Sequence, residues 1–340
     1  MNGISGVQFS GISTAKVAFA PDLDETFHDW VGGNRSSKKI ANPRGLRAQN
    51  RFLAERQQDI AVIFNTSNTL RDMKKRIDLL QGAPLDGLIL GNGKQVFINY
   101  AEKPAEEWLG ELSEADSETE WDATVTNISN WSLPASKTVI RQTLLEEGYK
   151  PESGSDPDDL NGPLAGNAPD GTPIRFEFLD THSAFDLIVE SDDDATRQKG
   201  EAETNRLAKK IKVNLERYCG MSVEPTGFDM PVKEGGHLFV RDMAPAGVHK
   251  GSALQYALKK IPNLEAVITA GDNELNDPQA MTRLNYLNAN GELVPNLPVA
   301  MPERPAFVAK VGEHPNVVWS KPGSMNPAIK RQLKKINLLG

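Results

Sequence analysis

The chain has 340 residues, of which 39% are hydrophobic and 25% charged, and its formal net charge is −8. This composition excludes a globally disordered chain, and the length exceeds one ordinary domain, so we expect two domains or one large domain with an insertion. The acidic balance argues against a broad basic face for nucleic acid. The single cysteine, Cys219, excludes an intramolecular disulfide and a zinc site built from cysteines.

We expect neither a membrane-spanning helix nor a secretory signal. No apolar run approaches the roughly 18 residues that a membrane-spanning helix needs. Residues 1–16 lack the basic segment and apolar stretch of a secretory signal. We therefore expect a cytoplasmic protein that binds neither membrane nor nucleic acid.

The first part of the chain alternates apolar runs with helix-forming segments. The apolar runs at residues 16–20, 60–64 and 85–90 predict buried strands, and the segments at 45–59 and 68–80 predict helices. This β-α-β-α-β order predicts a parallel sheet with helical crossovers.

The character of the sequence changes after residue 92. Residues 175–178 and 185–189 read as two strands of a half-buried sheet, and residues 192–219 predict one long charged helix. We assign the acidic residues 192–194 to the positive N-terminal end of this helix and not to a metal site.

The parallel pattern returns near the C-terminal end. We expect a helix at residues 252–260, strands at 265–270 and 305–309, an edge strand at 317–319 and a final helix at 329–335. Together with the first elements, these predict one α/β core interrupted by a second domain.

Polar side chains stand where the predicted core strands end or where a helix begins. They are Asp22, Asp24 and Thr26 after the first strand, Thr66 after the second, Lys250 before the 252–260 helix, and Asp272 and Asp277 after the 265–270 strand. The carboxyl ends of parallel strands meet at one edge of the sheet, where ligands bind. Four acids at one edge would repel each other unless a hard cation lay among them, and carboxylate oxygens suit Mg²⁺. Acids, Mg²⁺, a lysine and a hydroxyl together indicate phosphoryl transfer.

Each of these segments also has a structural explanation when it is taken singly. Asp22 and Asp24 would form a turn or helix cap, Thr66 an N-cap, and Asp272 the turn before a helix. Lys250 alone would be a solvated lysine. It is their order and their places at element ends that favour a common site.

In this order the segments resemble the four motifs of the haloacid dehalogenase (HAD) superfamily. Residues 22–26 (DLDET) resemble the DxDxT first motif, Thr66 the second, residues 250–254 (KGSAL) the KGxAL third motif, and residues 271–277 (GDNELND) the acidic fourth. The resemblance implies a Rossmann-like parallel-sheet core and phosphate chemistry through a covalent aspartyl phosphate.

The resemblance also implies a role for each residue that matches a motif. Asp22 would be the nucleophile, and Asp24 would protonate the leaving oxygen and then activate water. Thr66, Ser67 and Lys250 would bind the substrate phosphate.

The metal site is implied in the same way. Mg²⁺ would be held by Asp22, the backbone carbonyl of Asp24 and Asp272, with Asn273 and Asp277 in support. The fourth motif is one residue longer than is usual among Cof-like relatives, so Asn276 and Asp277 both remain candidates for its second acidic role. The second motif departs further, because Ser67 and Asn68 stand where relatives commonly have Gly-Arg.

The position of the insertion indicates which branch of the superfamily the chain resembles. The stretch from Thr66 to Lys250 is far longer than that from Thr26 to Thr66, so the extra domain lies between the second and third motifs. This is similar to the C2B-capped branch, which includes Cof-like and sucrose-phosphate phosphatases (subfamily IIB). We expect a HAD-like hydrolase core of residues 1–92 and 233–340 and an α+β, C2B-type cap of residues 93–232 that selects the substrate.

The sequence thus predicts a Mg²⁺-dependent phosphatase, a phosphoric monoester hydrolase that acts on a small phosphorylated metabolite, with a sugar phosphate as first choice. Two alternatives remain open. One is a phosphomutase or phosphotransferase, because phosphomannomutases share this cap; the other is a catalytically retired, ligand-binding HAD protein. We expect a monomer or a weak homodimer.

Overall fold

The computed structural model describes most of the chain. The described residues are 11–24, 26–27, 30–31, 39–40, 42–80, 82–156, 159–178, 183–189, 193–232, 236–302, 304–322 and 324–338. Glu25 of the predicted first motif and Asp192 of the predicted helix start lie outside them.

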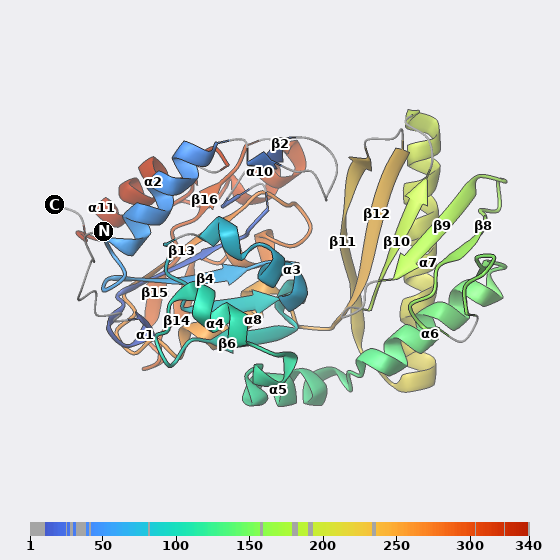
Figure 1. Cartoon of the computed structure of the whole chain (residues 1–340), viewed down its shortest axis with the longest axis horizontal. Coiled ribbons are helices and arrows are strands. Elements are labelled where there is room, and N and C mark those ends of the chain that lie inside the picture. The colour runs from blue at the N-terminus through green and yellow to red at the C-terminus, as the bar shows by residue number, and fades with distance from the viewer. Residues whose placement is uncertain are drawn as a thin grey trace. The chain divides into compact units, whose positions relative to one another are not determined.

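The chain divides into two compact units (Figure 1). The first comprises residues 1–31, 39–122 and 249–340, and the second comprises residues 32–38 and 123–248. Helix α5, Thr119–Ser129, runs across one of the junctions.

The first unit is built on a seven-stranded sheet in the order β17-β16-β13-β1-β4-β5-β6. Its strands are β1 Val17–Pro21, β4 Ile60–Asn65, β5 Gly87–Leu90, β6 Gln95–Ile98, β13 Ala266–Gly271, β16 Val299–Ala300 and β17 Val318–Trp319. All neighbouring strands are parallel except β5 and β6. Strands β1, β4 and β13 are buried along their whole length, which explains their continuous apolar sequences.

Helices surround this sheet. They are α1 Gly11–Thr14, α2 Pro43–Ala54, α3 Leu70–Lys75, α4 Ala105–Glu111, α8 Lys250–Leu258, α9 Pro278–Met281, α10 Pro305–Val311 and α11 Asn326–Lys335. Helices α2 and α11 come from distant parts of the chain and pack together (Figure 1). Short 3₁₀ turns span Ile77–Leu80, Gly91–Gly93 and Glu114–Asp116, and two small ribbons complete the unit: β2 Trp30–Val31 with β3 Lys39–Ile40, and β14 Asn285–Leu287 with β15 Leu293–Pro295.

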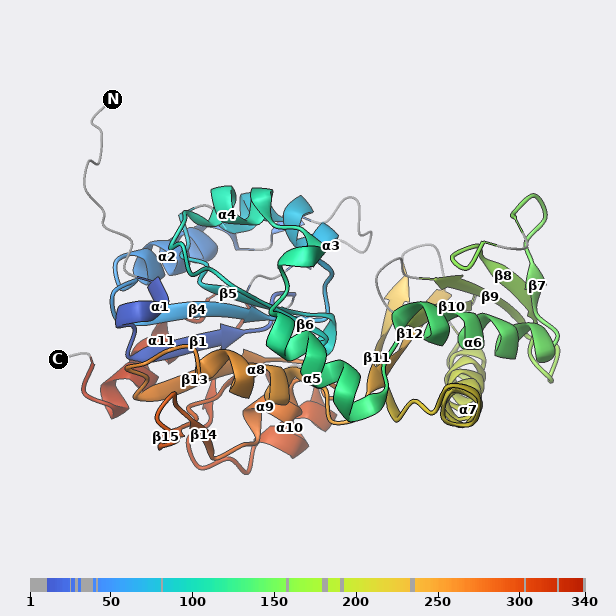
Figure 2. The same cartoon turned by 90° about the horizontal axis from the view of Figure 1, so that it is seen from below.

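The second unit is an antiparallel sheet in the order β11-β12-β10-β9-β8-β7, with two long helices. The strands are β7 Lys150–Pro151, β8 Leu164–Asn167, β9 Pro173–Phe178, β10 Ala184–Val189, β11 Val223–Val232 and β12 Gly236–Pro245, and the helices are α6 Leu133–Glu146 and α7 Asp194–Cys219. Both helices lie on the same side of the sheet (Figure 2) and share one apolar core with it. The Asp193 side chain caps α7 by accepting from Thr196 N–H, and Gly220 ends the helix in the left-handed conformation (φ 63°).

The predicted class is confirmed: a parallel-sheet α/β core carries an inserted α+β unit. One predicted element is wrong, because residues 305–309 form helix α10 and not a strand. Pro305 is pre-shaped for the first turn of a helix, and Phe307 and Val311, four apart, bury one face of it. The strand next to β13 is instead β16.

The junctions between the units lie later in the chain than the expected ones after residues 92 and 232. Strand β6 pairs with β5 and so extends the first sheet, and β12 pairs with β10 and β11 in the second sheet. The observed junctions therefore fall after residues 122 and 248. Among the described residues, no helix combines the length and the apolar character that crossing a membrane requires.

Candidate active site

Three neighbouring strands of the first sheet carry polar residues at their carboxyl ends. Strand β1 lies between β4 and β13 and runs parallel to both. Asp22 directly follows β1, Thr66 follows β4, and Asp272 follows β13. The topology therefore brings residues from three distant segments to one edge of the sheet, as the sequence predicted.

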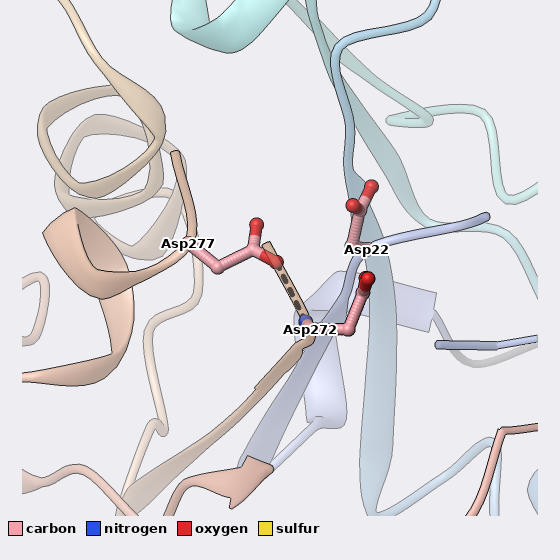
Figure 3. Close-up of side chains that lie close together, drawn as sticks. All are labelled: Asp22, Asp272 and Asp277. Atoms are coloured by element: carbon pink, nitrogen blue, oxygen red, sulfur yellow. Dashed lines mark hydrogen bonds between the residues drawn. The ribbon is translucent and has the colours of Figure 1, made fainter. Parts of the chain in front are cut away.

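Three buried carboxylates meet at this edge (Figure 3). Asp22, Asp272 and Asp277 are 7%, 5% and 2% exposed, and one oxygen of each lies within 4.8 Å of the others. Burying three acids together is costly unless positive charge compensates them. A group of hard carboxylate oxygens of this kind fits a divalent cation such as Mg²⁺.

Lys250 provides one compensating charge. Its side chain is 2% exposed, and its ammonium Nζ lies 3.2 Å from Asp22 Oδ2 and 2.6 Å from Asp277 Oδ1. Lys250 is the first residue of α8, whose start is capped by His249: the imidazole Nδ1 accepts from the N–H groups of Gly251 and Ser252, each at 3.1 Å. One ammonium between two acids leaves the three-acid group net negative.

Asp277 uses both carboxylate oxygens on protein groups. Oδ1 accepts from Lys250, and Oδ2 accepts from the main-chain N–H groups of Asp272 at 2.8 Å (dashed in Figure 3) and Asn273 at 2.9 Å. It thus holds the lysine and the loop after β13 together. Both oxygens of Asp277 are therefore engaged by protein groups.

Asp272 faces a hydroxyl and a guanidinium. Its Oδ1 accepts from Thr26 Oγ1 at 2.9 Å, and Arg304 lies 3.5 Å from Oδ2. Thr26 is the last residue of the DLDET segment and is fully buried. Its hydrogen bond to Asp272 therefore connects the first motif to the fourth.

The side chain of Asp24 lies outside the three-acid group and has its own partners. Its Oδ2 is 2.5 Å from Arg76 Nη1 and accepts from Asn68 Nδ2 at 3.0 Å. The same amide of Asn68 lies 2.8 Å from Thr66 Oγ1. Asn68 therefore links the candidate acid–base group to the candidate phosphate-binding hydroxyl.

Two other predicted residues lie in the turns beside these groups. Ser67 follows the buried Thr66 in the turn after β4 and is half-buried. Asn273 stands in the turn after β13, where its Oδ1 accepts from Leu275 N–H at 2.8 Å.

The electrostatics of the group follow from its burial. Burial is the largest cause that raises the pKa of Asp22, and Lys250 opposes it; with the charges of Asp277 and Asp24 raising the pKa and the N–H of Leu23 lowering it, the pKa comes to about 6. Burial disfavours the ammonium form of Lys250, but the two neighbouring acids outweigh it and raise its pKa above the usual range. The lysine is therefore a fixed cation, and the nucleophile candidate depends on nearby positive charge to stay ionised.

Several residues of the site were missed by the sequence analysis. Arg76, Arg304 and Asn68 contact the predicted acids, and Asn65 donates to the main-chain carbonyl of Lys250 at 3.1 Å. No motif marks these residues. One signal was available: Asn68 stands where relatives commonly have an arginine. Its absence indicated that an arginine from another segment could take that place.

No protein-family model and no curated protein matches the sequence. Among solved structures, the chain is similar to sucrose-phosphatase from Synechocystis sp. PCC6803 in complex with sucrose and phosphate. The TM-score is 0.56 at 12% identity, over 93% of this chain and 98% of that chain. It also matches yhjK, a haloacid dehalogenase-like hydrolase from Bacillus subtilis, with a TM-score of 0.49 at 13% identity over 98% of this chain and 96% of that one. A third match is a HAD subclass IIB sugar phosphatase, with a TM-score of 0.42 at 13% identity over 95% and 99% of the two chains.

At these identities the likeness concerns the fold. The chain shares its fold with the sucrose-phosphatase, and this fold is a parallel-sheet core with an inserted α+β unit. The fold that the four motifs predicted is thereby confirmed.

Proposed function

We propose that this chain is a Mg²⁺-dependent phosphatase that hydrolyses a small phosphorylated metabolite, with a sugar phosphate as the first candidate. One observation carries the proposal: buried Asp22 lies between a fixed ammonium, 3.2 Å away on Lys250, and the acids Asp272 and Asp277. A carboxylate held against a cation and beside a metal-binding acid is equipped to attack phosphorus. The fold shared with a sucrose-phosphatase supports the same reading.

Asp22 and Asp24 divide the covalent chemistry between them. An oxygen of Asp22 attacks the phosphorus, the bond to the leaving oxygen breaks, and an aspartyl phosphate forms at Asp22. Asp24 donates a proton to the leaving oxygen and then takes one from the water that hydrolyses the aspartyl phosphate. Arg76 and Asn68 hold the carboxylate of Asp24 during both steps.

Thr66, Ser67 and Lys250 bind the phosphate oxygens in this proposal. The Thr66 hydroxyl accepts from Asn68 and has its own proton to donate. Lys250 stays charged because its pKa lies above the usual range. Asp277 orients this lysine, and Asn273 anchors the loop that carries Asp272.

Asp22, Asp272 and the backbone carbonyl of Asp24 would hold Mg²⁺. When bound, the cation would screen the negative charges of the acids and the phosphate from each other. The protein's own contribution is to keep the two acids buried and fixed, through Thr26 on Asp272 and Lys250 on Asp22.

The second unit would choose the substrate, because all four motifs belong to the first unit. We retain the proposals of a cytoplasmic monomer or weak homodimer that binds neither nucleic acid nor membrane. A phosphomutase or phosphotransferase would use the same groups but would return the phosphoryl group to an organic acceptor. A catalytically retired, ligand-binding protein would not need the ion pair between Asp22 and Lys250.

Phosphate release from a panel of sugar and nucleotide phosphates, with and without Mg²⁺, tests the proposal. We expect Mg²⁺-dependent release of inorganic phosphate from at least one sugar phosphate. Transfer to an added sugar without release would favour the mutase or phosphotransferase. Binding without any turnover would favour the retired protein.

A further inference from the structure

Asn65 is a buried polar side chain at the end of an otherwise apolar strand. It is the last residue of β4, directly before Thr66, and it is 3% exposed. Its Nδ2 donates to the main-chain carbonyl of Lys250 at 3.1 Å. Within the part of the chain that the structure describes, no donor reaches its Oδ1.

Stability alone does not explain an asparagine at this position. A buried hydrogen bond contributes a modest net gain, and a buried carbonyl oxygen without a donor costs at least as much. An apolar side chain of the same shape would remove the oxygen that lacks a donor, at the loss of one hydrogen bond to the Lys250 carbonyl. The remaining five residues of β4, Ile-Ala-Val-Ile-Phe, are all buried and apolar, as expected for a central parallel strand.

The partner of Asn65 explains what the side chain does. The carbonyl of Lys250 lies at the first position of α8, and the ammonium of the same residue lies between Asp22 and Asp277. The hydrogen bond therefore joins the main chain just before Thr66 to the main chain of Lys250. The two phosphate-binding residues of the proposed function are connected through Asn65.

The main chain of His249, directly before Lys250, is also closely packed. Gly93, in the left-handed conformation (φ 101°), follows β5 and packs against His249 so closely that a Cβ at position 93 would lie 2.6 Å from the His249 carbonyl carbon. The Trp121 indole N–H donates to Gly93 O at 2.9 Å. Two contacts therefore restrain the main chain at the start of α8. One is the hydrogen bond from Asn65 at the end of β4, and the other is the close packing of Gly93, which follows β5.

We propose that Asn65 is a positioning residue that sets the distance between Lys250 and Thr66, and that it is retained for turnover at the expense of stability. This inference rests on the proposed function. It goes beyond that function by assigning a role to a residue that touches neither phosphate nor metal.

The test is Asn65→Leu, which keeps the side-chain shape and removes the amide. We expect kcat to fall by roughly 10- to 100-fold, because small misplacements of catalytic groups cost rates of this order. We expect KM to change much less and the melting temperature to stay equal or rise. The matched control is Thr269→Val in β13, which removes the buried hydrogen bond from Thr269 Oγ1 to Asn296 Oδ1 (2.9 Å). It should lower the melting temperature and leave kcat unchanged.

The possible outcomes separate this inference from the proposed function. Wild-type protein that releases no phosphate from any ester overturns both. An active wild type with Asn65→Leu kinetics within about twofold overturns the positioning role alone. A parallel loss of melting temperature and kcat also overturns it, because that pattern marks a structural residue. Should Asn65→Leu fail to fold, Asn65→Ala is assayed by kcat and KM, because the cavity that it leaves lowers the melting temperature in either case. A kcat within about twofold of wild type overturns the positioning role, and so does a rise in KM with kcat unchanged.

Discussion

The ammonium of Lys250 lies 2.6 Å from Asp277 and 3.2 Å from Asp22, so one cation bridges the first and the fourth motif. All three side chains are at least nine-tenths buried. A buried charge that loses its partner is strongly destabilising. The bridge therefore ties the integrity of the core to the groups proposed for chemistry.

The first prediction concerns the two acids of the first motif. Asp22→Asn should abolish turnover, because no nucleophile remains. Asp24→Asn should slow turnover by ~10²–10⁴-fold, as expected for the loss of a general acid and base. Steady-state phosphate release measures both, and near-normal activity in Asp22→Asn would contradict the covalent mechanism.

The second prediction concerns the metal. EDTA should abolish activity and added Mg²⁺ should restore it, whereas Ca²⁺ should substitute poorly. Ca²⁺ takes more ligands at longer distances, which would shift Asp22 away from the phosphorus. Full activity in the presence of chelator would refute the metal assignment.

The third prediction concerns Arg76, the guanidinium partner of Asp24. Arg76→Gln should lower kcat on a sugar phosphate by roughly 10-fold or more, since a misplaced Asp24 protonates the leaving oxygen poorly. The loss on p-nitrophenyl phosphate should be smaller, because nitrophenolate leaves without a proton. Lys75→Gln is the matched control: it removes a positive charge from the preceding residue, whose side chain is 61% exposed. An equal loss on both esters would argue against the contact with Asp24.

The fourth prediction concerns the pH dependence of stability. It rests on Asp86, a buried residue that directly precedes β5 in the chain. Its pKa is raised to about 7, mainly by burial and in smaller part by the charge of Glu102, against the N–H of Val62, which lowers it. The folded protein therefore holds a proton that the unfolded chain, with a carboxyl pKa near 3.8, releases. The stability contribution of this protonated group is present below pH ~4 and is lost as the pH rises through ~7.

Asp86→Asn should remove this dependence, because the amide oxygen still accepts from Val62 and carries no charge. Relative to wild type, the variant should gain free energy of unfolding between pH 5 and 8. The gain in free energy of unfolding should be at most about 3 kcal/mol. It accumulates at roughly 1.4 kcal/mol per pH unit between pH 5 and the folded pKa of about 7. Urea unfolding at several pH values measures it, and a difference independent of pH would show that Asp86 titrates normally.

The four-motif reading of the sequence found the centre of the candidate site. Asp22, Thr66 and Asp272 follow buried strands whose apolar sequences are easy to recognise, and parallel pairing brings such strand ends together. Arg76 and Asn65 could not be found in this way. Their roles depend on contacts between segments far apart in the chain, and neither residue stands in a recognisable motif.

Helices and strands were predicted well where the hydrophobic residues followed one clear periodicity, either helical or strand-like. Residues 305–309 are short and apolar, and periodicity alone does not separate a buried strand from a short helix. The domain junctions were misplaced for another reason. Strand β6 reverses direction beside β5, and only the pairing itself assigns it to the first sheet.

The fifth prediction uses the observed junctions. Replacing residues 123–248 with a short Gly/Ser linker should leave a folded first unit, since its sheet and all four motifs lie outside that range. This core should keep weak activity on p-nitrophenyl phosphate and lose discrimination among sugar phosphates. Unchanged selectivity in a folded core would show that specificity does not reside in the second unit.

The central claim is that Asp22 carries the phosphoryl group during turnover. The most direct measurement is mass-spectrometric peptide mapping of the Asp24→Asn protein, quenched in acid while it turns over p-nitrophenyl phosphate with Mg²⁺. This variant should accumulate the intermediate, because the group that activates water is missing. The account predicts an acid-stable, hydroxylamine-labile phosphate on the peptide that contains Asp22. Active protein with a phosphate on another residue would contradict it.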